Sequence, residues 1–170
     1  APTWLPRVTL DHTSDSITYP LVTGLDGLTY LVNLASLELH VPQWTIGPDG
    51  LPGNPDRLVI DLDPGPGAGL QQCSVVALWV RDRLNPLGLD PVPVTSGSKG
   101  MQLYAALPGT HSSADMAALA QQLAEELTAE HPDVVVWKMT KSLRPGKVLL
   151  DWSQNVAAKT TISPYSLRGR

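Results

Sequence analysis

The sequence predicts an α+β fold built around a split βαβ unit, on three observations. From residue 57 onward, short apolar runs bounded by proline and glycine alternate with longer segments whose apolar residues recur at helical spacing. The resulting order is strand, helix, strand, strand, helix, strand, which is typical of the split βαβ unit. Hydrophobic residues make up 42% of the 170-residue chain, which is enough for the core of one domain.

Residues 1–56 are expected to form an N-terminal hairpin-plus-helix module that packs beside this unit. Two β-rich runs around a polar turn predict a hairpin over 7–22. Apolar residues at helical spacing predict a helix over 25–40, with Asp26 as its N-cap. Residues 41–57 begin extended and pass into a loop rich in proline and glycine.

Residues 57–170 are expected to hold the split βαβ unit, so that residues 1–170 make a single domain. Ser113 is well placed to cap the second helix of this unit. The expected elements are a strand over 57–63, a helix over 70–88, strands over 91–95 and 101–107, a helix over 113–131, strands over 134–137 and 147–153, and an extended polar stretch from 159 to 170. In this arrangement, which ferredoxin-like and RNA-recognition-type folds share, the last strand lies beside the first.

The composition excludes several kinds of site. The single cysteine, Cys73, sits in an apolar helical pattern, so a disulfide framework or a cysteine metal site is excluded. No apolar run reaches the roughly 18 residues of a membrane span, and no signal peptide is visible. We therefore expect a cytoplasmic protein without a membrane partner. The chain begins with Ala1 and not with methionine, which leaves open that it is a piece of a longer protein.

The net charge of −4 conceals an uneven distribution. Residues 1–137 hold five basic and fifteen acidic side chains, a net of −10, whereas residues 138–170 hold seven basic side chains and one acidic one, a net of +6. The basic side chains of the second segment are Lys138, Lys141, Arg144, Lys147, Lys159, Arg168 and Arg170. Such a segment is either an anion-binding surface or a solvated basic tail.

Two aspartates, Asp61 and Asp63, lie near the end of the apolar strand in RLVIDLDPGPGAG (57–69). Residues i and i+2 of a strand share a face, so the two carboxylates repel each other unless a cation lies between them. A hard divalent ion such as Mg²⁺ prefers oxygen ligands of this kind. Asp-x-Asp also occurs in phosphatases of the haloacid dehalogenase type and in many glycosyltransferases, and the pair could equally form a structural turn or cap.

A third carboxylate, Asp151 in VLLDWSQN (148–155), is expected on the strand beside the one that carries Asp61 and Asp63. Three aspartates that converge on one patch of sheet are what two-metal phosphoryl transfer needs. One ion lowers the pKa of the attacking hydroxyl, and the other holds the triphosphate and the leaving group.

Three further features are candidates for the site, and each has a purely structural alternative. The segment TSGSKG (95–100) combines glycines, hydroxyls and Lys99, which suits a phosphate but also a tight hairpin; the spacing of a Walker A loop is absent. Arg168 could hold a phosphate with two hydrogen bonds or be solvated near the end of the chain. His40 follows an expected helix, where a histidine more often packs or caps.

Taken together, the motifs HVPQW, DLDPG, TSGSKG, TKSLRPGKVLLDWSQN and KTTISPYSLRGR, in this order, resemble the polymerase domain of bacterial ligase D. The resemblance runs from about Trp4 to Arg170. That domain belongs to the archaeo-eukaryotic primase superfamily and works in non-homologous end joining. The resemblance therefore implies a primase-polymerase core whose split βαβ unit is RNA-recognition-like.

The resemblance also implies roles for individual residues. Asp61 and Asp63 match the family's metal-binding pair, and Asp151 matches its third catalytic carboxylate. The residues that match nucleotide-binding positions are Ser96 and Lys99, which hold the triphosphate, and His40, Gln154 and Arg168. Two Mn²⁺ or Mg²⁺ ions are implied at the carboxylates.

By the same resemblance, the expected function is template-dependent nucleotide addition, with a preference for ribonucleotides, at gaps and ends during double-strand break repair. The implied partners are nucleoside triphosphates, DNA ends or gapped duplex, the end-binding protein Ku and a ligase module, and the implied location is the nucleoid. The alternative is a primase-like module that binds nucleotide or nucleic acid without turnover.

One departure from the family pattern matters. Family polymerase domains are longer at the N-terminus, where lysines and aromatic residues grip the 5′-phosphate of the downstream strand and stack on the template. The opening APTWLPRVTL supplies none of these. We therefore expect a truncated core with reduced activity and no site for the downstream 5′-phosphate.

Overall fold

The computed structural model of this protein describes residues 1–11 and 15–168, and its centre is a five-stranded sheet in the order β7-β8-β6-β10-β9. The strands are β6 (Arg57–Pro64), β7 (Val92–Thr95), β8 (Met101–Ala106), β9 (Val135–Val136) and β10 (Val148–Asp151). β6 pairs antiparallel with both β8 and β10. The strand that carries Asp151 therefore lies beside the strand that carries Asp61 and Asp63, as predicted.

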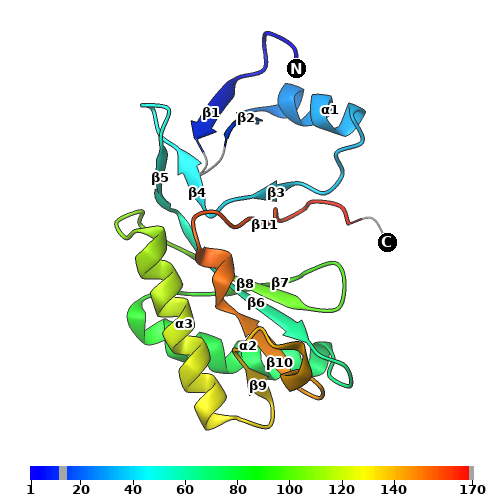
Figure 1. The fold of residues 1–170 in the computed structure, drawn as a ribbon, viewed down its shortest axis with the longest axis vertical. Helices are drawn as coiled ribbons and strands as arrows, with labels where there is room; N and C mark the ends of the chain where they lie inside the picture. The colour runs from blue at the N-terminus through cyan, green and yellow to red at the C-terminus, as the bar shows by residue number, and fades with distance from the viewer. Residues whose placement is uncertain (12–14, 169–170) are drawn as a thin grey trace.

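Two helices, α2 (Leu70–Leu84) and α3 (Ser113–Glu130), cover one face of this sheet (Figure 1). The alternate residues Leu58, Ile60 and Leu62 of β6 point into the core beneath them, and all three are buried. The period of two then sends Asp61 and Asp63 to the other face. The hydrophobic core thus fixes which face of the sheet carries the carboxylates.

The N-terminal part of the chain lies on the side of the sheet away from the helices (Figure 1). It begins with the predicted hairpin, in which β1 (Arg7–Asp11) and β2 (Ser16–Pro20) pair antiparallel. The later elements are the helix α1 (Leu25–Asn33) and the short strands β3 (His40–Val41), β4 (Trp44–Ile46) and β5 (Pro52–Pro55). The polar turn at 12–14 and the last two residues, with Arg170, lie outside the described residues.

The C-terminal segment returns to the N-terminal part. After β10 come a 3-10 turn, η3 (Trp152–Asn155), and β11 (Thr161–Ile162), which pairs antiparallel with β3. A second 3-10 turn, η2 (Lys141–Leu143), lies between β9 and β10. None of the helices in the described part of the chain is long and apolar enough to cross a membrane.

Several expected boundaries were wrong. The first helix ends at Asn33 and not at residue 40, because Ala35 adopts a left-handed conformation (φ 59°) that a helix cannot continue. Its N-cap is Gly24; Asp26 instead accepts a hydrogen bond from the backbone N–H of Gly27. The second helix ends at Leu84 and passes into a 3-10 turn, η1 (Asn85–Leu87).

Two more expectations need correction. The third helix is capped by Ser112 and not by Ser113: the Ser112 hydroxyl accepts from the N–H of Asp115, and the Asp115 carboxylate accepts from Ser112 in return. The expected loop over 41–57 contains the antiparallel pair β4 and β5.

Candidate functional site

The strand register places the carboxylates in one row across the sheet. Asp61 of β6 lies directly opposite Asp151 of β10 on one side and directly opposite Gln102 of β8 on the other. Directly opposed residues of antiparallel strands point to the same face, and Asp63 follows Asp61 by two positions. Asp61, Asp63 and Asp151 therefore share the face of the sheet that the helices leave open.

Asp61 is the most perturbed group of this row. Its side chain is buried, and one of its oxygens, Oδ1, has no hydrogen-bond partner. Burial, together with the smaller effects of the Asp63 and Asp151 charges, raises the pKa of Asp61 to about 7. A hydrogen bond from Gln102 and the charge of Arg168 act against this shift. Asp61 is thus a carboxylate whose surroundings favour a positive partner.

Asp151 is turned toward its own chain. Its Oδ1 accepts from the backbone N–H of Ser153 at 2.9 Å and from the Ser153 hydroxyl at 2.7 Å, and its Oδ2 accepts from the Gln154 amide at 3.2 Å. Asp151 therefore caps η3. Within the described residues, no three His, Cys, Asp or Glu side chains are grouped closely enough to hold a metal ion. A metal centre of three aspartates remains a prediction.

The turn after β10 also holds Gln154 in place. Asn155 is buried, its Oδ1 accepts from the N–H of Val59 at 2.9 Å, and its Nδ2 donates to the C=O of Val59 at 2.7 Å. The Asn155 side chain thus replaces a strand partner for β6 just where β10 has ended. This contact fixes the turn, and with it Gln154, beside the carboxylate row.

The segment 95–100 is a tight turn between β7 and β8, and it also lies against the carboxylates. The N–H of Ser96 donates to the C=O of Gly100 at 3.0 Å, and the N–H of Gly100 donates to the Ser96 hydroxyl at 3.2 Å. A Cβ on Gly100 would lie 2.5 Å from the Leu62 carbonyl oxygen and 3.3 Å from Oδ1 of Asp63. Only glycine allows this approach. The turn therefore brings exposed Lys99 close to Asp63.

Arg168 is held in the site and is not a solvated terminal side chain. Its Nη1 donates to the backbone oxygen of Ser96 at 2.5 Å, and its alkyl chain packs over Gly97. Its Nε lies 4.0 Å from Oε1 of Glu38. The guanidinium is close enough to Asp61 to lower the pKa of that carboxyl. Arg168 and the turn at Ser96, 72 positions apart in sequence, thus form one wall of the site.

His40 reaches the site through the pairing of β3 with β11, in which it lies opposite Ile162. Its side chain is exposed, and its Nε2 lies 3.6 Å from Oε2 of Glu38. Because α1 ends at Asn33, His40 does not directly follow a helix as expected. A role in nucleotide binding stays a prediction.

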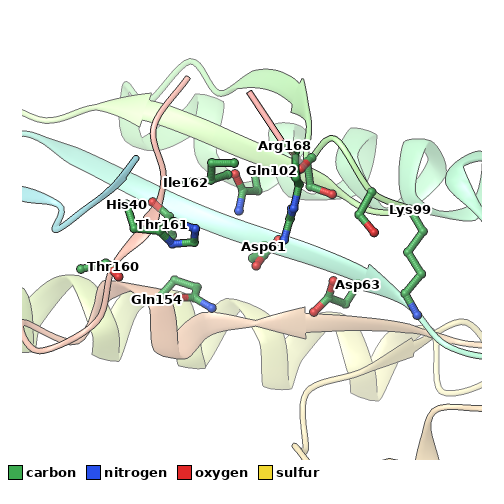
Figure 2. A pocket seen from close by; sticks show the side chains of 12 residues that line it. His40, Asp61, Asp63, Lys99, Gln102, Gln154, Thr160, Thr161, Ile162 and Arg168 are labelled. Carbon is green, nitrogen blue, oxygen red and sulfur yellow. The ribbon is translucent and has the colours of Figure 1, made fainter. Parts of the chain in front are cut away.

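These groups line one cleft of about 320 Å³ (Figure 2). Its floor is the face of β6 that carries Asp61 and Asp63, with Lys99 at one end and His40 at the other. The predicted site residues that line it are His40, Asp61, Asp63, Ser96, Lys99, Gln154 and Arg168. Asp151 lies next to the cleft, opposite Asp61, but does not line it.

Five other lining residues were not predicted: Ser98, Gln102, Thr160, Thr161 and Ile162. Ser98 belongs to the turn 95–100, which was predicted as a phosphate-binding candidate. Gln102 could have been found as a polar residue in the middle of an apolar strand, opposite the aspartates once the strand order was known. The remaining three depend on β11, and a two-residue strand has no periodicity that predicts it.

The basic segment after β9 lies at the C-terminal end of β6, just beyond Asp63. A Cβ on Gly65 would lie within 2.0 Å of the Arg144 carbonyl oxygen, so the two backbones are in direct contact. Arg144 donates to the Met139 carbonyl at 2.6 Å and Lys147 to the Pro132 carbonyl at 2.5 Å, and Lys138 lies over the Trp137 ring. Part of this charge therefore supports the local fold.

The fold and the cleft define an α+β domain with an acidic sheet face and a cationic, hydroxyl-bearing wall opposite it. A model of the LigD primase-polymerase domain family matches residues 1–170 of the chain. The chain belongs to this family, and the resemblance stated from the motifs is confirmed.

The similar proteins are themselves larger. The chain is 49% identical over 170 residues to the multifunctional non-homologous end joining protein LigD of Mycolicibacterium smegmatis, which covers all of this chain and 22% of that protein. It is 34% identical over 143 residues to the bifunctional protein LigD of Bacillus subtilis, covering 84% of this chain and 23% of that protein. The chain thus spans about a fifth of the length of these relatives.

A solved structure has the same fold. The polymerase domain from Mycobacterium tuberculosis ligase D in complex with DNA superposes on the whole of this chain with a TM-score of 0.95 and 49% sequence identity, and the match covers 61% of that chain. The match confirms the mixed α/β architecture.

Proposed function

We propose that this chain is the catalytic core of a template-dependent nucleotidyltransferase that adds nucleotides to DNA at gaps and broken ends during double-strand break repair. The observation that carries the proposal is one juxtaposition. Asp61, Asp63 and Asp151 share a sheet face, and in the cleft on that face Arg168 lies close to Asp61 while Lys99 lies at the Asp63 end (Figure 2). An acidic floor opposite a cationic wall suits a nucleoside triphosphate bound with divalent cations.

The residues of the wall are proposed to hold the triphosphate. Lys99 supplies a point charge, Arg168 a planar guanidinium, and Ser96 a hydroxyl and a backbone turn that set the position of both. At the other end of the cleft, His40 and Gln154 are proposed to contact the nucleotide. Gln154 comes from the turn that Asp151 caps, so the nucleotide and the third carboxylate share one support.

The carboxylates fit a divalent metal by their chemistry. The buried Oδ1 of Asp61 has no hydrogen-bond partner, and the pKa of Asp61 is raised by burial and by its two acidic neighbours. A hard cation would satisfy the oxygen and offset the repulsion. When bound, two Mn²⁺ or Mg²⁺ ions would lower the pKa of the attacking hydroxyl and neutralise charge on the triphosphate.

Further parts of the proposal follow from the family. The relatives are named for non-homologous end joining, and the solved relative was determined with DNA. We propose DNA ends or gapped duplex as the substrate, ribonucleotides as the preferred triphosphates, and Ku and a ligase module as partners at the nucleoid. We also propose that β6 to β10 form an RNA-recognition-like split βαβ unit and that residues 1–170 act as one catalytic core.

Primer extension tests the proposal. A gapped duplex with a defined template base is incubated with this chain, Mn²⁺ and either ribonucleotides or deoxyribonucleotides. The proposal predicts addition of the complementary nucleotide, faster with ribonucleotides. Addition that ignores the template, or release of phosphate from a simple monoester without any DNA, would contradict it.

A second candidate is a binding module without turnover, and one observation favours it. Both oxygens of Asp151 accept hydrogen bonds from Ser153 and Gln154, and Asp151 does not line the cleft. Nucleotide binding by this chain in Mn²⁺ without any primer extension would favour this candidate over the enzyme.

A further inference from the structure

Gln102 is the neutral member of the row that contains the carboxylates. It lies directly opposite Asp61 on β8, just as Asp151 lies directly opposite Asp61 on β10, and it is buried. A buried amide in an apolar strand is costly unless its hydrogen bonds are made. The hydrogen-bond partners of Gln102 therefore determine how its amide is oriented.

Tyr104 sets the direction of the Gln102 amide. The Tyr104 hydroxyl donates to Oε1 of Gln102 at 2.7 Å and also lies 3.1 Å from the Ile162 carbonyl oxygen. Because Oε1 accepts from Tyr104, the NH₂ end of the amide is left to face Asp61. From this cross-strand position the amide acts to lower the pKa of the Asp61 carboxyl, against the effect of burial.

One oxygen of Asp61, Oδ1, is buried without a hydrogen-bond partner. A carboxylate that faces an amide donor across the strand pair and keeps such an oxygen can accept a cation. Tyr104 in turn is tied to Ile162 of β11, the strand that pairs with the segment of His40.

We propose that Gln102, with Tyr104 behind it, is a positioning residue that orients Asp61 for a divalent metal ion. This inference rests on the proposed function, since it concerns the metal that function requires. Groups that orient metal ligands from behind typically contribute roughly 10–100-fold to metal affinity. Gln102 and Tyr104 carry no charge at neutral pH, so they would change metal affinity through the orientation of Asp61 and not through added ligand charge.

The test is Mn²⁺ affinity in the absence of nucleotide and DNA, measured from the electron paramagnetic resonance signal of free Mn²⁺. Gln102→Met keeps the length and removes the donor, and Tyr104→Phe keeps the ring and removes the hydroxyl. The inference predicts roughly 10-fold or greater weakening for Gln102→Met and a smaller weakening, still of several-fold, for Tyr104→Phe. Gln122→Met, on the exposed face of α3, is the matched control and should leave affinity unchanged.

The outcomes are separable. Mn²⁺ affinities of Gln102→Met and Tyr104→Phe equal to that of the wild type, with each variant shown to be folded by circular dichroism, would overturn the inference while leaving the proposed function standing. Weaker Mn²⁺ binding by Gln102→Met together with unchanged Mn²⁺ binding by Tyr104→Phe would also overturn it, because Gln102 would then be a ligand itself. No Mn²⁺ binding by the wild type would instead contradict the metal-dependent function on which the inference rests.

Discussion

At the scale of single residues, Asp61 determines the character of the site. The core residues on either side of it, Ile60 and Leu62, are fully buried and fix the strand, so Asp61 has no freedom to turn away from its acidic neighbours. Its raised pKa is the electrostatic consequence. A fold that holds such a group without a cation does so at a cost in stability.

That cost predicts that the stability of the metal-free protein depends on pH. The pKa of Asp61 is about 7 in the folded chain against an ordinary value of 3.8, so between these values the folded state binds a proton that the unfolded chain has released. The free energy of unfolding therefore falls as the pH rises from about 4 to 7 through this group. The free energy of unfolding of Asp61→Asn should not show this fall, and at pH 8 it should be about 2–4 kcal/mol higher than that of the wild type.

Urea unfolding in a chelator at pH 5 and pH 8 measures the effect. The stability difference between Asp61→Asn and the wild type should be small at pH 5, larger at pH 8, and reduced again at pH 8 when Mn²⁺ is added. A difference that is the same at both pH values would mean that Asp61 titrates normally.

The two cations of the wall give a second prediction at this scale. Lys99→Ala and Arg168→Ala should weaken binding of a nucleoside triphosphate by roughly tenfold or more, and binding of duplex DNA much less, because both side chains line the cleft and do not follow a duplex. Fluorescence titrations with nucleotide and with DNA compare the two losses. Equal losses would indicate a general basic surface.

At the scale of elements, the site depends on how closely the turn 95–100 approaches β6. Gly100→Ala would place a Cβ 2.5 Å from the Leu62 carbonyl, so either the turn or the strand must move. We expect a loss of about 1–3 kcal/mol in stability and a clear loss of triphosphate binding. Gly53→Ala in β5 is the control, since its Cβ would meet a backbone oxygen only at 3.4 Å.

Thermal unfolding and nucleotide titration of both variants check this prediction. If Gly100→Ala bound nucleotide as tightly as Gly53→Ala does, the turn would not set the position of Lys99 and Ser96.

The elements also show what a sequence can and cannot predict. Asp61, Asp63 and Asp151 were predicted to share a face, because the period of two in β6 and the order of strands and helices are both visible in the sequence. The pairing of His40 with Ile162 was not predicted, because a two-residue strand gives no pattern and its partner is more than a hundred positions away. Gln102 was missed because a lone amide in an apolar run carries no signal until its cross-strand partner is known.

At the scale of the whole molecule, charge is distributed unevenly around the cleft. The basic segment of residues 138–147 contacts the end of β6 at Gly65, but Arg144 and Lys147 already donate to backbone carbonyls. With an overall net charge of −4, few phosphate contacts are available. We expect weak DNA binding that falls steeply with salt. The logarithm of the association constant should fall by about 0.9 per phosphate contact for each tenfold rise in salt concentration.

Because few phosphate contacts are available, we expect the chain to bind a gap with a downstream 5′-phosphate little more tightly than one without it. Fluorescence anisotropy of residues 1–170 on two gapped duplexes, with and without the downstream 5′-phosphate, at two salt concentrations should give nearly equal affinities. Clearly tighter binding to the phosphorylated gap would mean that this chain contains a 5′-phosphate site that the sequence did not reveal.

The central claim is that three aspartates on one sheet face carry out nucleotide addition. The most direct test is primer extension in Mn²⁺ by Asp61→Asn, Asp63→Asn and Asp151→Asn, each beside the wild type and each shown to be folded by circular dichroism. We predict that all three lose activity entirely, because each removes a charge worth several kcal/mol at the transition state. Activity of any one variant within about tenfold of the wild type would contradict the claim, since a tenfold change in rate is only about 1.4 kcal/mol.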